Sequence, residues 1–240
     1  MSHSLHPFSH QEPHNDKTGK KLNKLRAAVL GANDGIISVA SIVVGVAGAS
    51  NSAKFIFTAG AAGLVAGALS MAVGEYVSVS AERDSEKALL RKERWELDNL
   101  PEEEFAELAG IYEKKGLSKQ TAQVVAEELT AHDAFAAHVD AELNIDPDNL
   151  TNPWNAAVAS AMSFFCGALI PLLIVFFSPT FARIPFTFFG VLFALVITGG
   201  LGAYVGGANK FTAIVRVVVG GLLAMAVTFG IGKLFGAVGV

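Results

Sequence analysis

The chain of 240 residues is poor in sulfur ligands and in nucleotide- or calcium-binding motifs. Its single cysteine, Cys166, lies in an apolar stretch, which excludes an internal disulfide and a metal site of the CxxC type. Any bound metal must therefore use oxygen, imidazole or thioether ligands. No P-loop and no DxDxDG calcium loop is present, so sites of these two kinds are excluded as well.

Long apolar stretches dominate what is present. Hydrophobic residues make up 52% of the chain, and the mean hydropathy is +0.45. Five stretches stand out, at residues 27–49, 53–79, 154–177, 184–208 and 211–231. Each is close to the ~20 residues with which a helix crosses ~30 Å of hydrocarbon. We therefore expect an all-α, multi-pass membrane protein with five transmembrane helices.

A polar segment, residues 1–25, precedes the first stretch. It has no apolar core and no small-residue cleavage site, so we expect a cytosolic tail and no cleaved signal peptide. Positively charged flanks stay on the cytoplasmic side of a membrane. The tail and its junction with the first stretch hold Lys17, Lys20, Lys21, Lys24 and Arg26.

The same tail contains four of the six histidines, which are His3, His6, His10 and His14. Their spacing of three or four residues is suited to loose collection of divalent cations. We favour the alternative, a disordered tail with incidental histidines, because nothing organises these side chains as ligands.

Four regions follow from this pattern. The tail covers residues 1–25, transmembrane helices 1 and 2 occupy 26–80, and transmembrane helices 3 to 5 occupy 151–240. Between them, residues 81–150 form an insert with 18 acidic and 8 basic residues, a formal charge of −10. Alternation of five spans from a cytosolic N-terminus places this insert in the cytosol and the C-terminus outside.

The insert has a helical pattern with clear stops. Its first helix continues from the second apolar stretch without a break and ends before Pro101, which suits the first turn of a second helix. That second helix ends near Gly116. Ser118 is expected to cap a third helix, and Asp133 a fourth that runs through Leu143.

Carboxylates and one imidazole recur on the insert helices in a pattern suited to metal binding. The candidate ligands are Glu93, Glu96, Glu104, Glu107, His138 and Glu142. Like charges on one helix face repel each other, and a bound cation would offset that cost. Such ligands suit divalent ions such as Mn²⁺, Fe²⁺ and Zn²⁺. The alternative, a solvated acidic domain without metal, has equal weight from the pattern alone.

Only two acidic residues, Asp34 and Glu75, lie within the apolar stretches. A carboxylate in hydrocarbon costs at least ~2.5 kcal/mol, so such a residue normally marks an ion or proton route. We expect both carboxylates at similar depth in the cytosolic half of the membrane. Met71, one helical turn from Glu75, adds a thioether, which favours Fe²⁺ or Co²⁺ over Mg²⁺ or Ca²⁺. The alternatives are a helix cap for Asp34 and ordinary apolar packing for Met71.

Three sequence strings carry a resemblance to a known family. GANDGIISVASIVVGVAG in the first stretch, GALSMAVGEYVSVSAERD in the second and IYEKKGLS in the insert resemble the vacuolar iron transporter family, including its bacterial members. The resemblance implies a homodimer of five-span subunits with a cytosolic metal-binding domain, exporting Fe²⁺ or Mn²⁺ from the cytosol in exchange for protons. Its transport aspartate and methionine match Asp34 and Met71.

The resemblance also implies roles in the insert. The family's metal-domain glutamates, in two i,i+3 pairs, match Glu93, Glu96, Glu104 and Glu107, and Glu142 is the best match on the last insert helix. Where the family member has methionine, this helix offers the imidazole of His138. That replacement leaves selectivity among Fe²⁺, Mn²⁺, Zn²⁺ and Co²⁺ open.

The leading hypothesis is secondary active transport driven by an ion gradient, since no P-loop is present. The partners expected are divalent metal ions, protons, the lipid bilayer and a second subunit, with no enzymatic activity and no nucleic acid. A membrane-anchored metal sensor or buffer is the main alternative, and a passive channel is a third. We favour a bacterial plasma membrane as the location, with an organellar membrane as the alternative.

Overall fold

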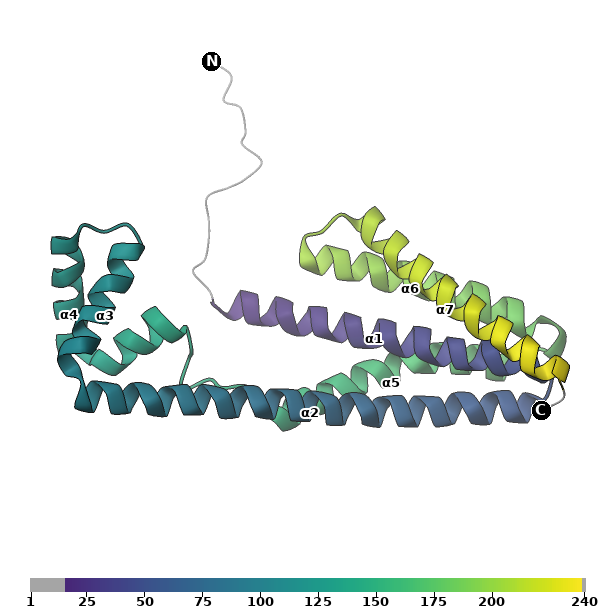
Figure 1. Cartoon of the computed structure of the whole chain (residues 1–240). Coiled ribbons are helices and arrows are strands. Elements are labelled where there is room, and N and C mark those ends of the chain that lie inside the picture. Colours follow the sequence, from purple (N-terminus) through teal and green to yellow (C-terminus); the bar gives the residue numbers. More distant parts are fainter. Residues whose placement is uncertain (1–15, 239–240) are drawn as a thin grey trace, which may run out of the picture. The chain divides into compact units, whose positions relative to one another are not determined.

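The computed structural model describes residues 16–238, and every regular element within them is a helix or a helical turn (Figure 1). The tail histidines considered above lie outside the described residues. The elements in chain order are α1 (Asp16–Ala49), α2 (Ala53–Asn99), α3 (Pro101–Lys114), α4 (Lys119–His138), the π-helical turn η1 (Val139–Leu143), α5 (Pro153–Phe177), the 3₁₀ turn η2 (Thr180–Ala182), α6 (Arg183–Gly206) and α7 (Lys210–Val238).

Five of these helices are long and apolar enough to cross a membrane, which confirms the predicted number of spans. They are α1, α2, α5, α6 and α7. Several helices are longer than the predicted spans, because they continue into polar residues beyond the apolar stretches. In particular α1 begins at Asp16, and α2 continues unbroken to Asn99.

The chain divides into two compact units. The first, here called the membrane unit, comprises the described residues up to Ala72 together with those from Val158 onward. The second, here called the acidic unit, is Val73–Ala157. The apolar part of α2 ends near Val79, so most of the acidic unit lies beyond the membrane-spanning residues.

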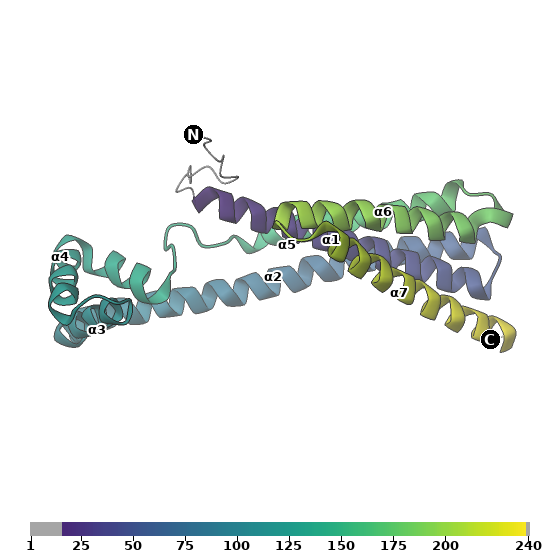
Figure 2. The same cartoon turned by 90° about the horizontal axis from the view of Figure 1, so that it is seen from above.

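In the membrane unit, α1 lies against α6 and α7 (Figures 1 and 2). On one side, Val39 and Val43 of α1 pack in a buried cluster with Leu64 of α2 and Phe164 of α5. On another side, α1 packs against α6 and α7 around the fully buried Met225. Helix α1 is therefore held from two sides, and it positions Asp34.

Close helix packing in this unit depends on glycine. A methyl group at Gly35 would overlap the carbonyl oxygen of Phe164, and one at Gly232 would overlap that of Gly45. Gly63 and Gly67 of α2 likewise face Ile42 and the ring of Phe164. Small residues let transmembrane helices approach closely. These contacts show that glycines of the second span pack against other helices of the same subunit.

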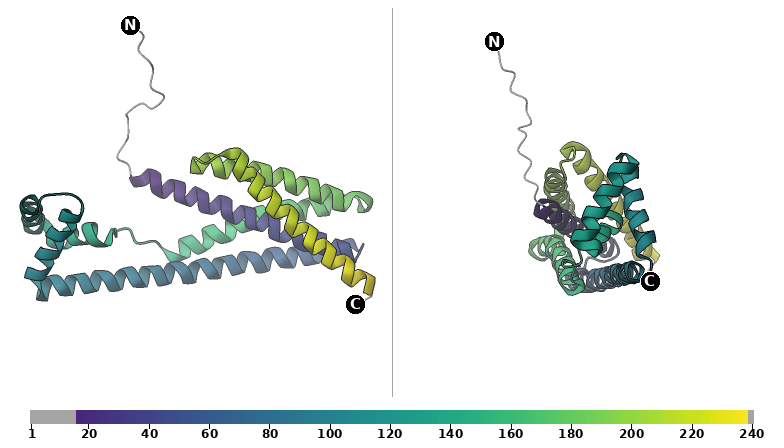
Figure 3. Two further views of the ribbon diagram at one scale, coloured as in Figure 1. Left: turned by 45° about the horizontal axis from the view of Figure 1, so that its top comes forward. Right: turned by 90° about the vertical axis from the view of Figure 1, so that its left-hand side faces the viewer.

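In the acidic unit, α3 and α4 form a helical pair, which Figure 3 shows in two orientations. Their core is Leu108, Ala109 and Ala126. Pro101 begins α3 as predicted, and the hydroxyl of Ser118 accepts a hydrogen bond from the backbone N–H of Thr121 at 3.3 Å. The pairing places the end of α4 and η1 near α3.

Candidate metal centre

A break in α4 precedes the candidate metal ligands on η1 and the last turn of α4. Asp133 has an extended backbone (φ −161°, ψ 94°), and its Oδ1 accepts a hydrogen bond from the N–H of Ala136 at 2.9 Å. Asp133 therefore caps a new helical segment, as the sequence predicted. The guanidinium of Arg94 on α2 lies 4.1 Å from the ring centre of Phe135, which ties this segment to α2.

Four side chains of types that can bind a metal ion meet at this point. Atoms of Glu93, Glu104, His138 and Glu142 all lie within 4.8 Å of one another. His138 is fully buried, while Glu93 and Glu104 are 2% and 5% exposed. Glu142 is exposed. The sequence predicted all four as ligands, and they come from α2, α3, α4 and η1, so only the tertiary fold brings them together.

The spacing of the ligating atoms fits a divalent cation. Nδ1 of His138 lies 3.0 Å from Oε1 of Glu93 and 3.3 Å from Oε2 of Glu104. Ligand atoms about 2.1 Å from an ion in octahedral geometry lie roughly 3 Å apart. These short approaches do not have hydrogen-bond geometry, because the same three atoms have no hydrogen-bond partner among the described residues. Buried polar groups rarely stay unpaired, and a shared cation would satisfy all three.

The pKa shifts in the cluster also favour binding of a divalent cation. Burial, together with the carboxylates of Glu142 and Glu104, raises the pKa of Glu93 to about 7. Burial likewise raises the pKa of Glu104 and of Glu142, and it lowers the pKa of His138. Without a cation, therefore, the carboxyl groups repel one another and hold protons more tightly than usual. A divalent ion would relieve the repulsion and displace those protons.

The two remaining predicted ligands of the insert lie at the edge of this cluster. Glu96 binds Lys92 through a 2.6 Å ion pair, and Glu107 is exposed on α3. Neither belongs to the group of four. Both nevertheless raise the pKa of Glu93, so their charges reach the cluster.

The predicted transport residues stand on α1 and α2. Asp34 is exposed on α1, and its Oδ1 accepts a 2.9 Å hydrogen bond from the hydroxyl of Ser38. Met71 is partly buried against the cluster that joins α1, α2 and α5. Glu75 is exposed and belongs to the acidic unit, whereas Asp34 belongs to the membrane unit, so the pairing of the two carboxylates stays a prediction.

Sequence reasoning missed two polar neighbours of Asp34. Ser38 donates the hydrogen bond described above, and Oδ1 of Asn33 is buried without a hydrogen-bond partner among the described residues. The signal for Ser38 was its position four residues after Asp34, which places both side chains on one face of a helix. Asn33 adjoins Asp34 in the sequence, but its burial depends on packing that no pattern reveals.

Comparison with known proteins identifies the family of this chain. Residues 25–233 match the model of the VIT family. The chain belongs to the VIT family. It is 44% identical over 237 residues to a vacuolar iron transporter of Acanthamoeba castellanii, covering 96% of this chain and 85% of that protein. It is 39% identical over 217 residues to vacuolar iron transporter homolog 1 of Oryza sativa subsp. japonica, with coverages of 90% and 75%.

A third VIT relative is vacuolar iron transporter homolog 1 of Arabidopsis thaliana, 38% identical over 218 residues, with coverages of 90% and 86%. Membership of the VIT family and the five candidate spans make this chain an integral membrane metal transporter and not an enzyme. Both the family resemblance and the membrane class predicted from the sequence are thereby confirmed.

Proposed function

We propose that this protein is a secondary active transporter that exports Fe²⁺ and Mn²⁺ from the cytosol in exchange for protons. The observation that carries the proposal is the cluster of Glu93, Glu104, His138 and Glu142, of which the first three are buried. A five-helix membrane protein needs no such arrangement for stability, because buried carboxyl groups without partners destabilise a fold. The iron named in its relatives agrees with the ligand chemistry.

In this proposal the acidic unit is a cytosolic metal-binding domain inserted between transmembrane helices 2 and 3. Glu93, Glu104, His138 and Glu142 hold the ion, and Glu96 and Glu107 add negative charge around it. An imidazole among carboxylates also suits Zn²⁺ and Co²⁺. The N-terminus lies on the same side, and the host membrane we favour is a bacterial plasma membrane.

The transport path in this proposal runs past Asp34, Met71 and Glu75. Asp34 belongs to neither buried cluster of the membrane unit and is exposed within one subunit. A carboxylate facing lipid at this position costs at least ~2.5 kcal/mol, so a second subunit that covers this face of α1 would remove the penalty. This supports a two-fold homodimer in which two copies of Asp34 line a shared path.

Metal flux into proteoliposomes, measured with and without a proton gradient, tests the proposal. An exchanger moves Mn²⁺ faster when protons flow in the opposite direction, and collapse of the gradient slows it. Equal flux under both conditions would indicate a passive channel. Metal binding to the protein without any flux would indicate a membrane-anchored sensor or buffer.

A further inference from the structure

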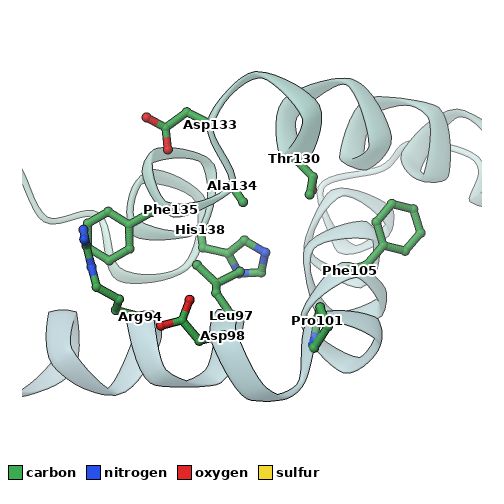
Figure 4. Close-up of a pocket in the computed structure, with 10 residues that line it drawn as sticks. All are labelled: Arg94, Leu97, Asp98, Pro101, Phe105, Thr130, Asp133, Ala134, Phe135 and His138. Atoms are coloured by element: carbon green, nitrogen blue, oxygen red, sulfur yellow. The ribbon is translucent and has the colours of Figure 1, made fainter.

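A cavity of about 540 Å³ lies within the acidic unit, beside the metal cluster. Its walls come from the end of α2, the start of α3 and the broken part of α4 (Figure 4). Its lining includes the carboxylates of Asp98 and Asp133 and the guanidinium of Arg94, together with Thr130 and His138. None of its acidic residues belongs to the group of four ligands.

His138 is the one residue that the cavity and the metal cluster share. Its Nδ1 faces Glu93 and Glu104, while Nε2, at the distal end of the ring, is buried and has no hydrogen-bond partner among the described residues. Figure 4 shows the imidazole surrounded by the side chains that line the cavity. The hydroxyl of Thr130 is buried and unpartnered in the same wall. Two buried polar groups therefore lack partners beside this space, as expected where a hydrated guest is accommodated.

The dimensions of the cavity favour an ion that retains its water. Among the described residues, only the group of four has three or more ligating atoms within 4.8 Å, so the cavity carboxylates cannot coordinate an ion directly as a set. Six water molecules occupy roughly 180 Å³ at about 30 Å³ each, which this space can contain. Two carboxylates against one guanidinium leave the walls with a net negative charge, which raises the local concentration of cations.

We infer that this cavity is the access chamber through which a hydrated divalent cation reaches the buried cluster. Asp98 and Asp133 attract the ion, and the ring of His138 forms the wall across which it sheds water and meets Glu93 and Glu104. The inference rests on the metal site of the proposed function. In the competing route, the ion reaches the cluster past the exposed Glu142. That route does not explain why Nε2 of His138 and the hydroxyl of Thr130 are buried without hydrogen-bond partners among the described residues.

The rates of metal binding to the full-length protein in detergent test the chamber. Trp154→Phe leaves Trp95, two residues from Glu93, as the only tryptophan, and stopped-flow quenching of its fluorescence by Co²⁺ reports binding and release. Ala134→Phe narrows the cavity without altering a ligand. We expect the rate constants for Co²⁺ association and dissociation to fall by the same factor, about tenfold, so that the Kd for Co²⁺ is unchanged. The matched control is Ala136→Phe, at an exposed position on the same segment that does not line the cavity.

A double variant tests whether the carboxylates that line the cavity attract the ion. Asp98→Asn combined with Asp133→Asn should slow association several-fold at low ionic strength and less at high salt, because steering is screened. Asparagine preserves the helix cap at position 133. The control, Glu127→Gln with Glu128→Gln, removes the same charge from exposed positions of α4 and should leave the rate unchanged.

The outcomes separate the chamber from the metal site. If Ala134→Phe binds Co²⁺ with the parent rates and affinity, the ion takes another route and the chamber is wrong while the metal site stands. If the parent protein binds no Co²⁺, or binds it equally after Glu93→Gln with Glu104→Gln, the metal site itself fails and the chamber fails with it.

Discussion

The two units handle carboxylates in opposite ways. The acidic unit buries Glu93 and Glu104 against a fully buried imidazole, with ligating atoms 3.0 to 3.3 Å apart. In the membrane unit the carboxylate of Asp34 is exposed, and it accepts a hydrogen bond from the hydroxyl of Ser38. Several converging ligands bind an ion tightly, whereas one carboxylate beside a hydroxyl binds it weakly. Under the proposed function, this difference suits a division of labour in which the acidic unit collects ions and the membrane unit transports them.

Removing the membrane carboxylate should give the largest effect. We expect Asp34→Ala to abolish Mn²⁺ transport, because no other acidic side chain lies in the apolar part of α1. Binding of Mn²⁺ to the acidic unit should persist. Flux into proteoliposomes and equilibrium binding to the same purified variant measure the two quantities separately. Transport at the parent rate would remove Asp34 from the path.

Removing two buried ligands should affect binding before transport. We expect Glu93→Gln with Glu104→Gln to weaken Mn²⁺ binding by roughly 100-fold, since neutral amides replace ligating carboxylates. Calorimetry on the full-length protein, with Asp34→Ala as background, isolates this site. The control is Glu113→Gln, at an exposed position of α3. If the double variant binds Mn²⁺ with the same affinity as the control, the acidic residues form a solvated surface and not a metal site.

The metal-free protein should lose stability as pH rises. The folded state binds a proton at Glu93 more tightly than the unfolded chain does, since its pKa is about 7 instead of 4.5. The stabilisation is full below about pH 4.5 and disappears as pH rises through 7. His138 acts in the opposite sense, because its lowered pKa gives stability above pH 6.5 that is lost in acid. Glu104 and Glu142 act in the same sense as Glu93, because burial raises their pKa values too.

Thermal unfolding in the presence of a chelator measures this effect. We expect a lower Tm at pH 8 than at pH 5.5, and Glu93→Gln should raise the Tm at pH 8 on the order of 5 °C by removing a buried charge. Saturating Mn²⁺ should reverse the trend, because it binds the deprotonated cluster. A Tm that rises steadily with pH without metal would contradict the electrostatic account of the cluster.

The smallest effect is expected at Ser38. We expect Ser38→Ala to slow transport by about fivefold at most, because the hydroxyl positions the Asp34 carboxylate through one hydrogen bond worth about 1 kcal/mol. Ser38→Thr retains the hydroxyl and serves as the control. Mn²⁺ flux into proteoliposomes should distinguish the two. Equal rates in Ser38→Ala and the parent protein would show that the bond has no role in transport.

Much of the fold followed from local signals in the sequence. Hydrophobic length determined the five spans, Pro101 marked the start of α3, and Asp133 marked the break in α4. The central place of α1 did not follow, because periodicity identifies apolar faces without naming their partners. It depends instead on contacts such as Gly35 with Phe164.

The sequence identified the candidate ligands, but it did not show which of them form the buried cluster. Sequence spacing offered Glu93 and Glu96 as equivalent ligands, yet Glu93 turns inward to His138 while Glu96 pairs with Lys92. Three residues along a helix amount to a rotation of about 300°, so small differences in helix packing decide which carboxylate is buried. The chamber beside His138 was invisible to the sequence, because its walls come from three helices.

The most direct test of the central claim, that the acidic unit holds a divalent ion at His138, is pulsed electron paramagnetic resonance of Mn²⁺ bound to the full-length protein. The expected spectrum shows coupling to an imidazole nitrogen that disappears in His138→Gln and survives in Asp34→Ala. A spectrum without nitrogen coupling, or one in which the coupling survives His138→Gln, would contradict the assignment.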